Sequence, residues 1–105
     1  MIAHLLLYKL RRDVDETRLE EMVRTTRSIL LKIPEVLRVH SGRNVEQESE
    51  WAFFVSFEVE SLDKLGMVEE DARYLRFLRD VIDPNTDARQ TFSFETDPSK
   101  DLRYS

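Results

Sequence analysis

Apolar and polar residues alternate along four stretches of this chain, and apolar residues recur at helical spacing along two others. The alternation predicts β-strands over residues 2–10, 36–46, 51–58 and 90–96. The helical spacing predicts helices over residues 15–33 and 61–82, the second with a break after Val68. Pro34 ends the first helix, because the residue before a proline avoids the helical region. Ser61 is an N-cap residue that starts the second.

The order of these elements is β-α-β-β-α-β, which is the split βαβ arrangement of ferredoxin-like folds. We therefore predict an α+β domain with a four-stranded antiparallel sheet over residues 1–97, followed by a polar tail at residues 98–105. In that fold the first and third strands are central. Here those are the two strands that are apolar on both sides, so the hydrophobic pattern and the topology agree.

Two helices can cover only one face of such a sheet, so the other face needs a different cover. Strand alternation places Leu5, Leu7 and Phe54 on that other face. Soluble monomers tend not to expose a continuous apolar patch of this kind. We therefore predict a homodimer whose two sheets pack face to face through these residues.

Composition and charge narrow the range of functions. The chain has no cysteine, which excludes disulfides, thiolate nucleophiles and Cys-ligated metals and fits a cytoplasmic protein. Its net charge of −5, with basic residues interleaved among acids, argues against nucleic-acid binding. No stretch approaches the length of a membrane span. His4 and His40 lie far apart without a carboxylate partner, and there is no phosphate-binding Gly-rich loop, so we expect neither metal nor cofactor.

Several stretches of the sequence resemble those of a known family in their order and spacing. They are the opening MIAHLLLYKL, the pair KIPEV and SGRN, the strand FFVSFE followed by SLDKL, and DARYLRFLRDVIDP before the last strand. Over about residues 1–96 the chain resembles the stress-responsive dimeric α/β-barrel family, usually called Dabb. The resemblance implies two four-stranded sheets that close into a barrel across a two-fold axis. The family includes plant stress proteins, many uncharacterised bacterial proteins and a plant polyketide cyclase acting on a linear tetraketide.

The chain departs from this family in the second helical region. The family often has Tyr, two residues, His-Pro, one residue and His there, and the cyclase's catalytic Tyr and His fall on Val68 and Tyr74. Valine cannot hydrogen-bond a substrate oxygen, and a tyrosine with a pKa of about 10 is a poor general base at neutral pH. We therefore predict no catalytic residue, and the resemblance leaves open whether the chain is an enzyme.

Of the cyclase's polar pocket residues, the resemblance keeps only the histidine of the first strand, His4. The resemblance also implies that the side of the strand that carries His4 faces the helices. The candidate pocket residues are His4, Leu6, Tyr8, Trp51, Phe53, Val55 and Tyr74. Their aromatic members could form a wall for a planar ligand, or all of them could be ordinary core.

Three functions remain open at this point. The first, which we favour, is a non-catalytic dimeric Dabb protein of uncharacterised molecular function that holds a small hydrophobic or aromatic ligand between the sheet and the helices. The second is a cofactor-free enzyme, similar to a polyketide cyclase, an isomerase or a monooxygenase, that uses His4. The third is a purely structural, stress-related dimer whose pocket is filled by its own side chains. An open cavity beside His4 would favour the first two, and a packed interior would favour the third.

Overall fold

The computed structural model describes residues 1–97 of the 105-residue chain, and the predicted polar tail at 98–105 lies outside the described residues. The elements follow one another as β1 (Ile2–Leu10), α1 (Glu16–Leu30), β2 (Arg38–Arg43), β3 (Trp51–Val59), α2 (Leu62–Glu70), α3 (Ala72–Phe77), the π-helical segment η1 (Leu78–Ile82) and β4 (Thr86–Glu95). This is the predicted β-α-β-β-α-β order, with the second helical region divided into three parts.

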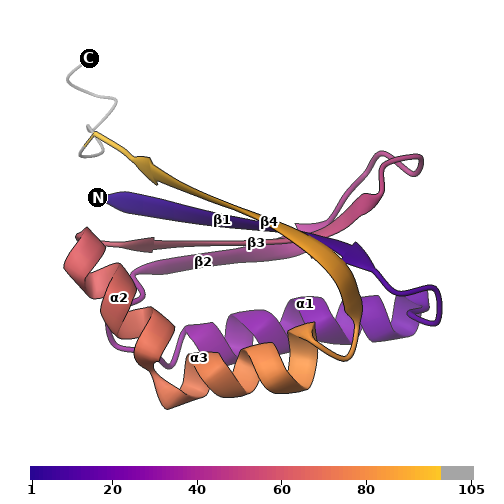
Figure 1. Ribbon diagram of the computed structural model, residues 1–105, viewed down its shortest axis with the longest axis horizontal. Helices are drawn as coiled ribbons and strands as arrows, with labels where there is room; N and C mark the ends of the chain where they lie inside the picture. Colours follow the sequence, from indigo (N-terminus) through magenta and orange to yellow (C-terminus); the bar gives the residue numbers. More distant parts are fainter. Residues whose placement is uncertain (98–105) are drawn as a thin grey trace.

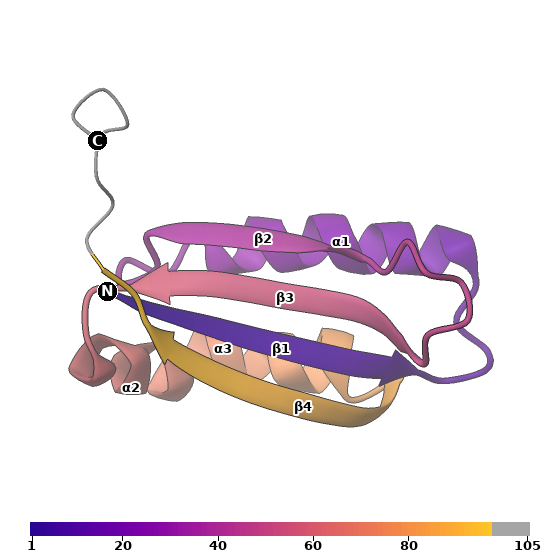
Figure 2. The ribbon, with the colours of Figure 1, turned by 90° about the horizontal axis from the view of Figure 1, so that it is seen from above.

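The four strands form one antiparallel sheet in the order β2-β3-β1-β4. Figure 1 shows α1, α2 and α3 on the same side of this sheet, and Figure 2 shows the opposite side, which no helix of residues 1–97 covers. We call that opposite side the free face. β1 and β3 are the central strands, as predicted, and the architecture is the α+β ferredoxin-like fold.

Side-chain caps fix where two of the helices begin. Asp15 Oδ1 accepts a hydrogen bond from the Arg18 amide at 2.8 Å, at the start of α1. Ser61 Oγ accepts one from the Lys64 amide at 3.2 Å, at the start of α2. Among the described residues, no helix combines the length and the apolar character needed to cross a membrane.

The ends of the helices differ slightly from those predicted. α1 ends at Leu30 and not at 33, because the chain then turns more tightly and the Ile33 amide donates to the Leu30 carbonyl. The break in the second helical region lies at Asp71, whose ψ of 134° is extended backbone. Asp71 Oδ1 accepts a hydrogen bond from the Arg73 amide at 2.8 Å and so caps α3.

The last strand is longer than its sequence pattern predicts. β4 begins at Thr86 and not at 90, and it pairs with β1 from Leu10↔Thr86 to Ile2↔Glu95. Residues 87–95 are exposed on both sides of this edge strand. Because neither side is buried within this chain, the first half of β4 needs no apolar alternation, and the sequence pattern therefore missed it.

The core lies between the helices and the helix-facing side of the sheet. Its largest fully buried side chains are those of Tyr8, Phe53, Phe57, Phe77, Leu30, Ile33 and Ile82. In β1 the buried positions 2, 4, 6 and 8 alternate with the half-buried positions 3, 5 and 7. The alternation shows that one side of β1 is sealed by this chain's own helices, whereas the other stays partly open on the free face.

Candidate functional site

His4 lies on the helix-facing side of β1, where the strand register pairs it with Phe57 of β3 and Ser93 of β4. Only 3 % of the residue is exposed. Its Nδ1 shares a hydrogen bond of 2.7 Å with Ser93 Oγ, and its ring centre lies 5.1 Å from that of Phe57. Burial lowers the pKa of His4, and the Glu69 carboxylate partly opposes this shift. His4 is therefore a neutral hydrogen-bonding group at neutral pH and not a fixed cation.

Tyr8 lies further along β1 on the same side and is wholly buried, with its ring 5.9 Å from that of Phe53. Its hydroxyl has no hydrogen-bond partner among residues 1–97. Burial raises the pKa of Tyr8, and it raises the pKa of Tyr74 to about 12. Both phenols therefore remain protonated at neutral pH and offer O–H donors.

Tyr74 reaches the same region from α3 and completes a run of aromatic contacts. Its ring centre lies 6.1 Å from Phe57 and 6.0 Å from Phe77. We call His4, Tyr8, Phe53, Phe57 and Tyr74 together the His4 site. Leu6 and Val55, which face each other across β1 and β3, are both buried on the same side. Six of the seven candidate pocket residues thus share the helix-facing side, and sequence reasoning missed Phe57 although its alternation with Phe53 was visible.

Trp51 is the exception, and the expectation that it lines the same pocket is wrong. A β-bulge lets β1 pair Tyr8 with Phe53 but Lys9 with Trp51, so that Ala52 is the extra residue. Because of this extra residue, Trp51 lies on the opposite side of the sheet from the side that simple alternation predicts. Trp51 therefore belongs to the free face, where Lys9 Nζ lies 4.9 Å from its ring centre.

The three interface candidates occupy the free face. Leu7 pairs with Phe54 across β1 and β3, and Leu5 pairs with Phe92 across β1 and β4; Leu5, Leu7 and Phe54 are half-buried. A hollow of about 440 Å³ lies on this face, with Leu7, Trp51 and Phe54 in its lining. Phe92 and Phe94 lie in β4 with their rings stacked at 6.2 Å and are 40 % and 54 % exposed. Sequence reasoning did not include these two phenylalanines among the interface candidates, although their alternation with polar residues was visible.

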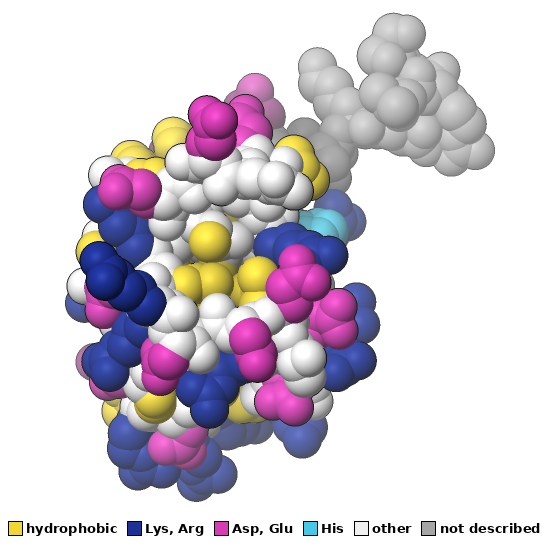
Figure 3. Space-filling model, turned by 90° about the vertical axis from the view of Figure 1, so that its right-hand side faces the viewer, with side chains coloured by type: hydrophobic (Ala, Val, Ile, Leu, Met, Phe, Trp, Pro, Cys, Tyr) yellow, Lys and Arg dark blue, Asp and Glu magenta, His cyan; other side chains and the backbone are white. Residues whose placement is uncertain are grey.

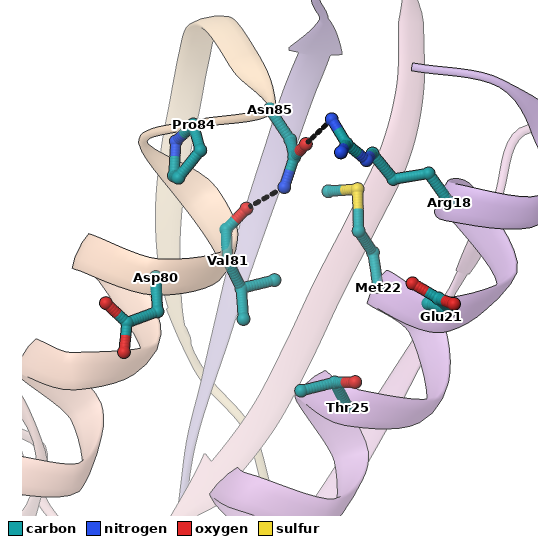
Figure 4. A pocket seen from close by; sticks show the side chains of 8 residues that line it. All are labelled: Arg18, Glu21, Met22, Thr25, Asp80, Val81, Pro84 and Asn85. Carbon is teal, nitrogen blue, oxygen red and sulfur yellow. Dashed lines mark hydrogen bonds between the residues drawn. The ribbon is translucent and has the colours of Figure 1, made fainter.

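A second hollow, of about 340 Å³, lies between α1 and η1 on the far side of the core (Figure 4). Across it, Arg18 Nη1 donates to Asn85 Oδ1 at 3.3 Å, and Asn85 Nδ2 donates to the Val81 carbonyl at 2.7 Å. Asn85 is one of the few buried polar residues, and its side chain bridges α1 to the turn after η1. Because these bonds already satisfy the amide, we interpret this cluster as a structural bracket.

The end of the molecule where the β2–β3 loop approaches the start of α1 is also hollowed, by about 400 Å³. Figure 3 shows this end, with charged side chains of both signs surrounding a small group of apolar atoms. Arg43 Nη1 and Glu16 Oε1 lie 3.7 Å apart there and link β2 to α1. Because charges of both signs are mixed here, this end of the molecule favours neither an acidic nor a basic partner.

Comparison with solved structures relates this fold to several proteins. A Dabb family protein with a ferredoxin-like fold from Mesorhizobium loti is 15% identical, with a TM-score of 0.79 over 92% of this chain and 97% of that chain. A dimeric ferredoxin-like protein of unknown function from Thermobifida fusca is 18% identical, with a TM-score of 0.80 over 90% of each chain. A hydroxynitrile lyase from Passiflora edulis is 10% identical, with a TM-score of 0.76 over 92% of this chain and 96% of that chain. At these identities the likeness establishes the fold alone.

No curated protein matches the chain. The family model of the stress responsive A/B barrel domain, however, matches residues 2–96, which is almost the whole part that the structure describes. That match agrees with the strand order, the one-sided helices and the open free face described above. The chain belongs to the Dabb family of stress responsive A/B barrel domains.

Proposed function

We propose that this chain is a homodimeric binding protein that holds a small, planar and largely apolar ligand at the His4 site, between the sheet and α2–α3. The observation that carries the proposal is the hydroxyl of Tyr8, which is buried and has no partner among residues 1–97. A buried hydroxyl without a hydrogen bond costs about 1–3 kcal/mol. A ligand oxygen that accepts from Tyr8 removes that cost, so the site is better satisfied when occupied.

The neighbouring groups suit a planar ligand. The rings of Phe53, Phe57 and Tyr74 supply flat apolar surfaces. Phe53 stacks on Tyr8, whereas Phe57 meets Tyr74 edge to face, and an aromatic ligand can make either kind of contact. His4 uses Nδ1 for its bond to Ser93, so Nε2 is the ring nitrogen left for a ligand. The site therefore combines a large apolar surface with a few polar groups, which is typical of small-molecule sites.

The edge of the sheet offers a route to this site. Every residue of β4 from 87 to 95 is exposed, including those on the helix-facing side. β4 therefore lacks the helical cover that seals β1 and β3. The His4 site is packed in this structure, and its residues line none of the hollows described above. A ligand must therefore open its own space, and we expect it to enter between β4 and α3 with an outward movement of Tyr74.

The sidedness of β4 supports the dimer. Its aromatic residues Phe92 and Phe94 point to the free face, whereas Arg89, Thr91 and Ser93 occupy the helix-facing side. The apolar side chains of β4 therefore face away from the helices of their own chain. Only another molecule can remove them from water. Solved structures of similar fold from Bacteroides fragilis and Thermobifida fusca are described as dimeric, and packing of two free faces explains this pattern in the present chain.

Calorimetric titration with the neutral probe 2-naphthamide tests the ligand site, with Tyr8→Phe and Thr26→Val as a matched pair of variants. Thr26 also has a buried hydroxyl without a partner among residues 1–97, but it lies on α1. Both variants delete one such hydroxyl, so both should preserve or raise the free energy of unfolding. Only Tyr8→Phe should weaken binding of the probe, by about tenfold for one hydrogen bond of roughly 1.4 kcal/mol.

Two results would count against this function. If neither naphthamide nor its charged analogue binds at millimolar concentration, the His4 site is simply packed core and the protein is a structural dimer. If Thr26→Val weakens the probe as much as Tyr8→Phe, the effect comes from general loosening of the core and not from a ligand contact.

A further inference from the structure

We infer that the ligand of the His4 site is an anion, a planar apolar molecule that carries a carboxylate, and that Arg89 of β4 selects it. This inference rests on the proposed function and adds the chemical class of the ligand. It depends on where β4 places one arginine relative to the buried phenol of Tyr8.

The strand register sets that placement. β1 and β4 pair Tyr8 directly with Arg89. Residues that face each other on neighbouring antiparallel strands send their side chains to the same side of the sheet, with Cβ atoms about 5 Å apart. Arg89 therefore leaves the sheet on the helix-facing side, at its open edge and next to Tyr8. Among residues 1–97 it makes no ion pair and no side-chain hydrogen bond, whereas its neighbour Arg11 donates to the Asp83 and Thr86 carbonyls.

Three polar groups at this end of the site are hydrogen-bond donors. Tyr8 and Tyr74 carry protonated hydroxyls, and the guanidinium of Arg89 carries only N–H groups. Arg89 lowers the pKa of both phenols in part, against the larger effect of burial, which reflects its closeness to them. Three acids also lie nearby: Asp83 toward Tyr8, Glu69 toward Tyr74, and Asp87, which lines one hollow together with Asp83 and Arg89. None of them lies within ion-pair distance of Arg89 among the described residues, and Asp87 pairs with Arg11 at 3.8 Å.

A set of donors around an unpaired guanidinium fits a carboxylate better than a neutral group. The two carboxylate oxygens offer about four acceptor positions, and a planar carboxylate can take a bidentate Arg contact while accepting from a phenol. His4 lies four residues from Tyr8 on β1, or about 13 Å by strand rise. The carboxylate would thus lie at the Tyr8–Arg89 end, with the apolar body extending along Phe57 toward His4.

The test compares 2-naphthoate with its neutral isostere 2-naphthamide by isothermal titration calorimetry on the full chain. The wild-type protein should bind naphthoate about tenfold more tightly than naphthamide. One additional charge-assisted contact of roughly 1.4 kcal/mol corresponds to that ratio. Arg89→Gln should weaken naphthoate far more than naphthamide and so remove that preference, and Arg89→Lys should keep part of it. Arg27→Gln, which removes an exposed arginine from the last turn of α1, is the matched control and should change neither affinity.

The outcomes separate this inference from the proposed function. Equal affinities for the two probes in wild type, or a preference that survives Arg89→Gln, overturn the anion inference and leave ligand binding intact. An equal loss of both probes in Arg89→Gln also overturns it, because Arg89 would then act only on the structure of the site. Failure of both probes in wild type overturns the proposed function itself. Raising the salt concentration gives an independent check without any variant, since it should weaken naphthoate alone.

Discussion

His4 Nδ1 and Ser93 Oγ, 89 residues apart in the chain, share a hydrogen bond of 2.7 Å that joins the buried side of β1 to the exposed edge strand β4. One partner belongs to the core and the other to a strand that no helix of the described residues covers. The bond therefore ties the position of β4 to the state of a titratable ring. It also limits His4 to one free ring nitrogen within the site.

The first prediction concerns stability at mildly acidic pH. Because burial lowers the pKa of His4 in the folded protein below 6.5, the unfolded chain binds a proton more readily than the folded one. This contribution to stability is fully present above about pH 6.5 and is lost as the pH falls below that value. Urea unfolding between pH 5 and 7.5 should therefore show a steeper decline for wild type than for His4→Gln.

His40→Gln is the control for this experiment, because His40 is an exposed residue of β2. This variant should keep the wild-type decline. An identical pH dependence in wild type and His4→Gln would contradict the assignment of the buried neutral histidine.

The second prediction concerns assembly. Phe94→Arg should convert the proposed dimer to a 12.5 kDa monomer in light scattering, because a charge would have to be desolvated between two sheets. Phe94 is 54 % exposed in the protomer, so the change should not disturb the fold. Phe54→Arg should act in the same direction, whereas Leu75→Arg, at an equally exposed position on α3, should leave the dimer intact. A wild-type chain that is monomeric at micromolar concentration would refute the packing of two free faces.

The third prediction concerns the close approach of Phe54 to Gly42, which face each other across β2 and β3. A Cβ atom at Gly42 would lie 2.9 Å from Cε1 of Phe54, so the ring must move. Gly42→Ala should therefore lower the free energy of unfolding by about 1–3 kcal/mol, the usual cost of overpacking. In a Phe54→Leu background the same change should cost little. Equal costs in the two backgrounds would show that the ring is not the cause.

The fourth prediction concerns catalysis. Purified protein incubated with a linear tetraketide thioester should give no cyclised acid above background. Val68 is fully buried and apolar, and a Tyr74 pKa of about 12 leaves almost no phenolate at neutral pH. Turnover clearly above background would show that another residue carries the acid–base role.

Two kinds of feature were predictable from the sequence: strands that are apolar on both sides, and helix ends that are marked by a capping residue or a proline. β1 and β3 were identified as central because both sides of each are apolar, and Ser61 and Pro34 marked helix boundaries that the structure places within a few residues. The start of β4 was not predictable, because an exposed edge strand imposes no pattern on its residues.

The side of Trp51 could not be read from alternation. One extra residue at Ala52 shifts the register between Tyr8 and Lys9, and a bulge leaves no clear signal in a single sequence. Arg89 was missed for a related reason: its importance comes from its partner across the strands, Tyr8, which is a contact between residues distant in the chain.

The bulge at Ala52 has a consequence for spectroscopy. Trp51 is the only tryptophan in the chain, and the bulge sets it on the free face beside Lys9, away from the His4 site. Its emission should therefore respond to whatever covers the free face and remain largely unchanged when a ligand enters on the helix-facing side. A single inserted residue thus gives the molecule an optical reporter of association that is separate from ligand binding.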